Sequence, residues 1–304
     1  MTSGSDIRYL SRKDIDTERW DDCIASASNG LIYATTNYLD HMCDDWDGLV
    51  LGDYAAVMPL PWRKKWGIYY LYQPFLTAQL GVFGNDLSEF IISGFLNAVP
   101  KKFRYWEFSL NHQNLFAINS FPLHQRSNYV LSLLPAYEML FKNYRENIKR
   151  NIKKCSHYGC TTATGIKIED IISLTKLQAK EATKQDFENF KNLFQLLAEK
   201  GAAKTYGVLA KTGELLASCV FFFSHNRAYY ILVGNHPNGR TLGASHALID
   251  AFIKDHAGQN LLLDFEGSDI RNLAFFYSSF GATEEKYAAI KLNRLPWWGK
   301  WLKK

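Results

Sequence analysis

Three carboxylates, Asp264, Glu266 and Asp269, stand at and just beyond the end of an apolar stretch that indicates a central β-strand. In α/β sheets, ligands bind outside the carboxyl ends of the strands. Side chains alternate along a strand, so Asp264 and Glu266 are expected on one face and Phe265 on the other. A carboxylate that is partly buried beside Phe265 has a raised pKa and can take a proton from a reacting amine. Asp264 and Glu266 are therefore candidate general bases.

The same carboxylates also have a structural interpretation. One of them would cap the turn at residues 267–268 or pair with Arg271. We favour this interpretation for Asp269. Glu107, at the matching place in the first half of the chain, is interpreted as a relic.

The basic residues of the chain concentrate between positions 142 and 154. Six of them occur there with a single acid, Glu146, so the segment sums to +5, which equals the net charge of the whole chain: Lys142, Arg145, Lys149, Arg150, Lys153 and Lys154. On one helix, Lys142, Arg145, Lys149 and Lys153 would share a face beside an apolar stripe formed by Tyr144, Ile148 and Ile152. This face predicts an anionic partner: tRNA phosphates, a nucleotide-linked precursor or a phospholipid surface. A solvated basic helix is the other interpretation, and the two stay open.

Composition excludes several classes of protein. Of the 304 residues, 47% are apolar and 15% aromatic, which is too many for a disordered chain and enough for about two domain cores. The longest apolar run, residues 215–223, is about half of what a membrane-spanning helix needs, and the start of the chain shows no signal peptide. The 5 cysteines and 8 histidines are scattered. We therefore expect a cytoplasmic protein with no metal site and no disulfide framework.

Periodicity and turn residues predict alternating helices and strands around the candidate residues. Helices are expected at residues 17–28, 38–42, 87–99, 142–154, 169–180, 185–199, 242–256 and 272–280. Strands are expected at 49–51, 55–60, 67–72, 105–110, 129–134, 205–209, 215–223, 228–233, 261–265 and 287–292. Turns are expected at 62–65, 211–213 and 224–227, and a loop at 235–239. The strands that flank the helix at 242–256 should be parallel, because a helix-length connection joins them.

The second half of the chain repeats the layout of the first. The matched patches are Tyr69-Tyr70-Leu71 with Tyr229-Tyr230-Ile231, Trp106-Glu107-Phe108 with Asp264-Phe265-Glu266, and Leu134-Pro135 with Leu295-Pro296. Their offsets are 160, 158 and 161 residues, which indicates a duplicated domain rather than a solenoid. The prediction is an α/β fold with mixed sheets in two lobes, 1–135 and 136–304. We expect a cleft between them and the active site in the second.

This layout resembles two GNAT acyltransferase folds in tandem, as in the FemAB-type aminoacyltransferases. The resemblance rests on the basic segment 145–154, on residues 239–250, and on Leu263-Asp264-Phe265-Glu266-Gly267 followed by residues 274–281. It implies transfer of an acyl or aminoacyl group to an amine. The donor would be acyl-CoA, as in ordinary GNAT enzymes, or aminoacyl-tRNA with a cell-wall precursor as acceptor, as in the FemAB branch.

The resemblance also assigns site residues. In GNAT enzymes an RxxGxG or RxxGxA loop holds the CoA pyrophosphate at a helix N-terminus. Here Arg240, Gly243 and Ala244 fit that loop, and Ser245 departs from it. Gly243 is expected to let the backbone approach the ligand. Tyr277 stands where the family commonly has a lysine, and it would donate a hydrogen bond without bringing a charge. A plain junction between a loop and a helix is the alternative for residues 240–245.

The expected activity is thus N-acyl transfer by direct attack of an amine, with Glu266, Asp264 and Tyr277 as catalytic candidates and a backbone amide near residues 233–234 as oxyanion donor. Arg145, Lys149, Arg150 and Lys153 would bind a phosphate-bearing substrate. Two alternatives remain: acyl-CoA-dependent acetylation of a nucleotide sugar or small amine, and a non-catalytic binding protein of the same fold. Contact with tRNA is expected at 142–154, contact with DNA is not, and contact with a membrane surface is a further option through Trp297, Trp298 and Trp301.

Overall fold

The structure is a computed structural model and describes residues 6–179, 181–267 and 269–295. The chain divides into two compact units. Unit 1 holds the described residues of Met1–Arg126 and Lys286–Lys304, and unit 2 is Ser127–Glu285. Each unit has its own hydrophobic core, one around Phe95, Phe103 and Trp106, the other around Phe221 and Phe252.

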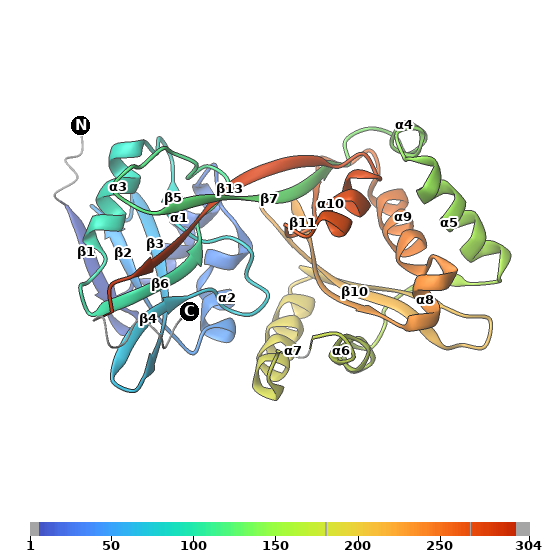
Figure 1. Cartoon of the computed structure of the whole chain (residues 1–304), viewed down its shortest axis with the longest axis horizontal. Helices are drawn as coiled ribbons and strands as arrows, with labels where there is room; N and C mark the ends of the chain where they lie inside the picture. Colours follow the sequence, from blue (N-terminus) through green and yellow to red (C-terminus); the bar gives the residue numbers. More distant parts are fainter. Residues whose placement is uncertain (1–5, 180, 268, 296–304) are drawn as a thin grey trace. The chain divides into compact units, whose positions relative to one another are not determined.

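Unit 1 is a twisted sheet with helices packed against its strands. The strands follow the order β1-β2-β3-β4-β6-β13, with β5 paired to β3; among the described residues of this unit, β4 and β6 are the pair that runs parallel. Their bounds are β1 Ile7–Ser11, β2 Asp45–Leu51, β3 Ala56–Lys65, β4 Ile68–Tyr72, β5 Phe83–Gly84, β6 Phe103–Ser109 and β13 Thr283–Asn293. The helices are α1 Thr17–Ser26, α2 Thr36–Met42 and α3 Glu89–Ala98, with 3₁₀ turns at Arg12–Asp14 and Ile32–Ala34. Figure 1 shows the arrangement.

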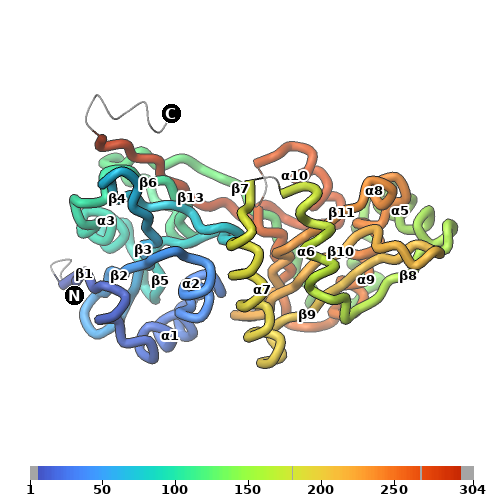
Figure 2. Tube along the Cα trace, turned by 90° about the horizontal axis from the view of Figure 1, so that it is seen from below, coloured from blue at the N-terminus to red at the C-terminus, as the bar shows by residue number. Residues whose placement is uncertain are grey.

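Unit 2 repeats this plan. Its strands follow the order β7-β12-β11-β10-β9-β8, and among its described residues β11 and β12 are the pair that runs parallel. Their bounds are β7 Leu123–Ser132, β8 Thr161–Thr164, β9 Ala203–Leu209, β10 Leu215–Ser224, β11 Arg227–Asn235 and β12 Leu262–Asp264. The helices are α4 Tyr137–Lys142, α5 Glu146–His157, α6 Ile168–Lys176, α7 Lys184–Glu199, α8 Pro237–Leu242, α9 Ala244–His256 and α10 Arg271–Ser278. Helices α6 and α7 cover one face of the sheet, and α5, α8, α9 and α10 lie on the other (Figures 1 and 2).

Local sequence signals explain where several helices begin. The side chains of Asp16, Thr35 and Ser88 accept hydrogen bonds from backbone N–H groups in the first turns of α1, α2 and α3. Thr183 and Asp186 form a reciprocal capping box at the start of α7. Such caps satisfy N–H groups that have no partner within the helix.

Each unit takes one strand that is displaced along the chain. Strand β7 follows β6 in sequence but pairs with β12 in unit 2, and β13 follows β12 but pairs with β6 in unit 1. Residues 127–135 therefore belong to unit 2, and the described residues from Lys286 onward belong to unit 1. The single lobe boundary after residue 135 stays a prediction about the ancestral repeat. The repeat pattern alone does not tell which unit takes β7 or β13.

Several expected elements differ from the structure. The basic segment is not one helix, because α4 ends at Lys142 and α5 begins at Glu146, with Arg145 as its N-cap residue. The expected loop at 235–239 contains the start of α8, whose first residue is Pro237, as helix N-termini favour. Residues 62–65 extend β3, and the turn lies at Trp66 and Gly67 instead. Strands β1 and β8 were not expected. The parallel pairing of β11 and β12 across α9 is confirmed.

In the described part of the chain, no helix combines the length and the apolar character needed to cross a bilayer.

Candidate active site

Strand β11 pairs with β12 over only the first part of its length. Its parallel pairing with β12 covers only Arg227 to Tyr229, which lie opposite Leu262 to Asp264. Residues 230–235 continue the strand with no pairing to β12. The pairing with β10 also shifts by one residue there, because Val220 lies opposite Leu232 and Phe221 opposite Tyr230, which leaves Ile231 as a β-bulge. Bulges redirect the strand and are frequent beside active sites.

A cavity of about 460 Å³ opens along this unpaired edge. Its walls come from β11, from the α8–α9 junction and from α10. They combine apolar and polar side chains: Tyr230, Val233, Leu273, Phe276 and Tyr277 together with Gln178, Asn235, Arg240, Ser245 and His246. A concave site with apolar walls and a few convergent polar groups is typical of a binding site for a small molecule. All of these residues belong to unit 2.

The predicted donor loop lies at this cavity, and its residues serve different purposes. Arg240 is exposed and lines the cavity. Ser245 is partly buried and also lines it, and its hydroxyl donates a hydrogen bond to the side-chain oxygen of Asn235. Gly243 joins α8 to α9 with a left-handed φ of 77°. A Cβ at this position would lie 2.7 Å from the carbonyl oxygen of Asn151, so Gly243 permits close packing against α5. Ala244 is fully buried. The sequence predicted that Gly243 lets the backbone approach a ligand, whereas in the structure it lets the backbone approach α5.

Tyr277 lines the cavity from α10, whereas Glu266 is not one of the lining residues and is linked to it through the effect of its charge on Tyr277. The Tyr277 ring stacks on Phe265, with centroids 4.5 Å apart, and the side chain is 8% exposed. Burial raises the pKa of Tyr277 far above its ordinary value, and the negative charge of Glu266 raises it further. The phenol is therefore protonated at neutral pH and is available as a hydrogen-bond donor. Glu266 follows the end of β12 with a φ of 61°, so it does not continue the strand alternation expected from the sequence.

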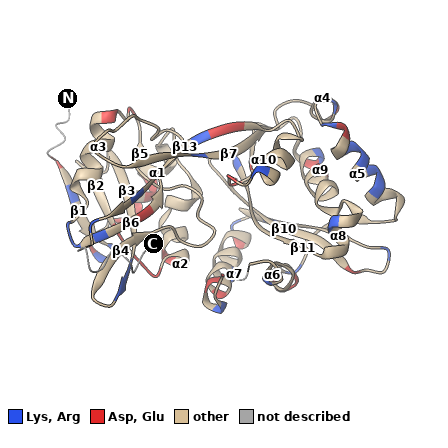
Figure 3. Cartoon of the chain, in the orientation of Figure 1, with Lys and Arg blue, Asp and Glu red and all other residues tan. Residues whose placement is uncertain are grey.

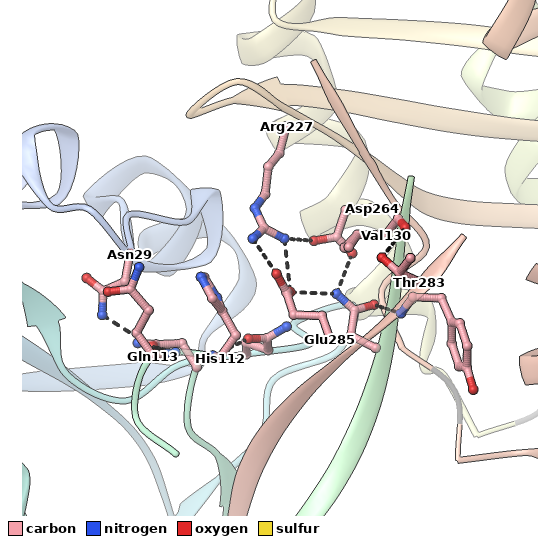
Figure 4. Close-up of polar contacts among 12 residues, drawn as sticks. Asn29, His112, Gln113, Val130, Arg227, Asp264, Thr283 and Glu285 are labelled. Carbon is pink, nitrogen blue, oxygen red and sulfur yellow. Dashed lines mark hydrogen bonds and ion pairs between the residues drawn. The ribbon is translucent and has the colours of Figure 1, made fainter. Parts of the chain in front are cut away.

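Asp264 lies in a buried polar network. It is 2% exposed, and its carboxylate lies 2.8 Å from Nη1 of Arg227. The other Asp264 oxygen accepts hydrogen bonds from Asn128 Nδ2 at 2.9 Å and from the backbone N–H of Glu266 at 2.8 Å. Arg227 also donates to both oxygens of Glu285, at 2.7 and 3.1 Å (Figure 4). The network joins β7, β11, β12 and β13.

Two physical consequences follow from this network. Burial disfavours the charged guanidinium, but the hydrogen bond to Glu285 and the charges of the two carboxylates raise the pKa of Arg227 overall. Asp264 also holds the backbone of Glu266 in its left-handed conformation, which non-glycine residues seldom adopt. Asp269 accepts a hydrogen bond from the backbone N–H of Ser127 at 3.1 Å, a contact that differs from the turn cap and the Arg271 pair suggested by the sequence.

His246 is a cavity residue that no sequence pattern singled out. Its ring meets Phe276 edge to face at 4.9 Å, and Nδ1 is buried without a hydrogen-bond partner among the described residues. Burial lowers the pKa of His246 to about 4. The imidazole is therefore neutral at physiological pH. Only its place one residue after Ser245, in the first turn of an expected helix, would have drawn attention to it.

The basic residues line the outer face of α5 (Figure 3). Ile148 and Cys155 are buried on the inner side, which packs against α9. Arg150 and Lys153 are exposed and have no ion-pair partner among the described residues, whereas Lys149 pairs with Glu146 at 3.0 Å. Arg145 lies over the ring of Phe275, 4.8 Å from its centroid. Lys142 is on α4 and so does not share the α5 face.

No group of three or more His, Cys, Asp or Glu suited to a metal ion occurs in the described ranges. Trp297, Trp298 and Trp301, the candidates for membrane contact, lie outside the described residues.

Comparison with known proteins agrees with this geometry. Residues 142–269 match the family model of the acetyltransferase (GNAT) domain. The whole chain is similar to a crystal structure of FemX, with 12% identity over 93% of this chain and 97% of that one, and a TM-score of 0.65. The fold is that of tandem GNAT proteins.

Two further structures share the fold. The C-terminal domain of a putative lysylphosphatidylglycerol synthetase from Agrobacterium fabrum has 11% identity over 92% of both chains and a TM-score of 0.57. A tandem GNAT protein from the clavulanic acid biosynthesis pathway has 11% identity over 95% of this chain and 99% of that one, and a TM-score of 0.53. No curated protein matches the sequence. The predicted resemblance and fold class are confirmed, and the family match supports the predicted class of enzyme, an acyltransferase.

Proposed function

We propose that this protein is an N-acyltransferase that binds its acyl donor in the cavity of unit 2. The observation that carries the proposal is the free edge of β11, which opens with a bulge into a cavity lined by Arg240, Ser245 and Tyr277. An acyl donor needs backbone groups to align its carbonyl, and an unpaired strand edge offers them. The family match over residues 142–269 covers most of this region.

The donor that the cavity supports best is an acyl thioester of coenzyme A. The apolar walls of the cavity, which include Val233, Leu273 and Phe276, suit the acyl chain and the thioester arm of this donor. Arg240, exposed beside the start of α9, supplies a positive charge for a phosphate. Because Gly243 packs against α5, the phosphate contact falls to Arg240 and the first turn of α9 rather than to the Gly243 backbone.

The proposed reaction is direct acyl transfer. The acceptor amine attacks the carbonyl carbon, the C–N bond forms, and the oxyanion is stabilised by backbone N–H groups from residues 230–235. Glu266 takes the proton that the amine loses. The C–S bond then breaks, the Tyr277 hydroxyl, which burial keeps protonated, stabilises the leaving thiolate by donating a hydrogen bond, and the proton held by Glu266 passes to the sulfur. Asp264 acts by positioning Glu266 through its backbone N–H.

For the acceptor, we propose the amino group of a cell-envelope precursor. The fold likeness to FemX and to the putative lysylphosphatidylglycerol synthetase supports this choice over a nucleotide sugar or a free small amine.

The test measures donor binding and turnover separately. Calorimetry with acetyl-CoA should give binding that falls about tenfold in Arg240→Ala, since one charged contact to phosphate is lost. Release of free CoA in the presence of a panel of amines should fall by about 10²-fold in Tyr277→Phe, with donor affinity retained. Lys254→Ala, at the far end of α9, serves as the matched control. Donor binding without any turnover in the unmodified protein would favour a non-catalytic binding protein.

Aminoacyl-tRNA is a second candidate donor, favoured by one observation. The exposed cations Arg150 and Lys153 on α5 have no ion-pair partner among the described residues. If tRNA is bound there, affinity for charged tRNA should fall steeply with salt, and the slope should flatten by about 2 in Arg150→Glu/Lys153→Glu. Acetyl-CoA binding should stay the same in this variant. A tRNA affinity that ignores both salt and the substitution would remove this candidate.

A further inference from the structure

The hairpin formed by β3 and β4 in unit 1 ends in an exposed aromatic residue. Strand β3 ends at Lys65 and β4 begins at Ile68, so Trp66 and Gly67 form a two-residue turn. The Trp66 side chain is 72% exposed, the largest exposed fraction among the large apolar residues of the described chain. Figure 1 shows this hairpin projecting beyond the other strands of unit 1.

A tryptophan is a poor choice for this turn on structural grounds. Both central residues have positive φ, 51° at Trp66 and 79° at Gly67, which is the pattern of a type I′ turn. Such turns strongly favour Asn-Gly, because bulky residues are strained at positive φ. The corresponding turn between β10 and β11 in unit 2 places His225 and Asn226 at these positions. Trp66 is therefore strained and exposed to water at once.

Within the protein, little compensates for these two costs. The Trp66 ring has the ammonium group of Lys65 4.8 Å from its centroid. Lys64 lies over Tyr69 at 4.9 Å. Arg63 is paired with Asp44, but Lys64 and Lys65 are exposed and have no ion-pair partner among the described residues. The tip thus presents one indole and two positive charges that no carboxylate neutralises within the described chain (Figure 3).

We propose that this hairpin tip docks on an anionic lipid surface. Indole rings favour the boundary between headgroups and acyl chains, and lysines beside them are attracted to anionic headgroups. Ile68, which lies directly opposite Lys65 and is partly exposed, adds aliphatic surface at the same depth. Single-stranded nucleic acid is less suited, because it requires a groove with successive stacking platforms, whereas this surface is one projecting tip.

This inference does not depend on the proposed acyl transfer, since the hairpin belongs to unit 1 and the cavity to unit 2. The contact should be weak and reversible, because each lysine near an anionic surface strengthens binding only about fivefold. It would place the enzyme at the surface where an amphipathic substrate is found.

Co-sedimentation of the full chain with phosphatidylcholine vesicles that contain about 30% phosphatidylglycerol tests the proposal. The unmodified protein should bind these vesicles, and pure phosphatidylcholine vesicles should bind it at least tenfold more weakly. Trp66→Asn should weaken binding about tenfold while its urea midpoint stays equal or rises, because Asn suits the turn. Lys64→Glu/Lys65→Glu should weaken binding further at low salt. Lys211→Glu, on the turn that joins β9 and β10, is the matched charge control and should bind normally.

Three results would overturn the proposal. The first is equal vesicle binding by Trp66→Asn and the unmodified protein. The second is loss of binding in Arg150→Glu/Lys153→Glu alone, which would assign the surface to α5. The third is binding to a single-stranded oligonucleotide that depends on Trp66 while vesicles are not bound. Trp66→Gly provides a second folded variant, since glycine adopts positive φ without strain.

Discussion

Units 1 and 2 share one strand order but end their parallel pairs differently. In unit 1, β4 stops at Tyr72, which still pairs with Glu107 of β6. In unit 2, β11 continues to Asn235 after its last pair with β12 at Tyr229. In unit 2, residues 230–235 of β11 therefore have an edge that does not pair with the parallel strand β12. The comparison teaches that a longer strand can free an edge for a binding cavity while the order of elements stays unchanged.

The matched carboxylates differ in the same way. Glu107 lies within β6, accepts a hydrogen bond from the Tyr105 hydroxyl, and has Lys291 at 3.4 Å on a half-exposed surface. Glu266 lies just past β12, held by Asp264, with its charge felt by the buried Tyr277. Unit 1 carries its glutamate on a regular strand, and unit 2 carries it at a position of positive φ whose charge acts on the cavity residue Tyr277.

The largest expected change in stability comes from removing the cation of the Arg227 ion pairs in unit 2. Arg227→Met should lower the free energy of unfolding by about 3–5 kcal/mol, because the buried Asp264 and the partly buried Glu285 would lose the cation that they share. Urea denaturation measures this. If the loss is below about 1 kcal/mol, the network is not what stabilises the end of β12.

Activity should distinguish the two glutamates. Glu266→Gln should lower kcat by about 10²-fold, since a general base commonly contributes about 10²–10⁴-fold. Glu107→Gln, the matched residue of unit 1, should leave kcat unchanged. Steady-state rates of CoA release measure both. Equal effects in the two variants would remove the functional difference between the units.

A pH-dependent loss of stability should come from His246 in unit 2. Its pKa in the folded protein is about 4, below the ordinary value of 6.5, so the unfolded chain binds a proton first. The stability is fully present above pH 6.5 and is lost as the pH falls towards 4, by an amount on the order of 2–3 kcal/mol. Urea midpoints from about pH 7 to about pH 4.5 should show this slope, and His246→Phe should flatten it. An unchanged slope in the variant would contradict the assignment.

The smallest effect is expected at the surface pair of unit 1. Lys291→Met should change the free energy of unfolding by less than about 1 kcal/mol, because both side chains are half exposed, at 51% and 53%. The same urea experiment as for Arg227→Met provides the comparison. A loss as large as that of Arg227→Met would show that burial does not separate the two ion pairs.

The sequence by itself determined the elements whose signals are local. Periodicity, caps and turn residues suffice for α7, α9 and the hairpin of β10 and β11, because neighbouring residues produce those signals. Matched patches at a constant offset likewise predicted two copies of one fold and the parallel pair around α9. Arg240, Ser245 and Tyr277 could be selected from their motifs, and the structure brings all three to one cavity.

Only the tertiary structure decided the rest. Which sheet receives β7 and β13 depends on pairing between distant residues, and Arg227 joins Asp264 and Glu285 across positions 37 and 58 residues away. The bulge at Ile231 and the early end of β12 are likewise properties of strand partners, which no local pattern encodes. Hydrogen-bond and charge partners are chosen in space, so the contacts that make Asp264 a buried anchor and Gly243 a packing residue appear only when the chain is folded.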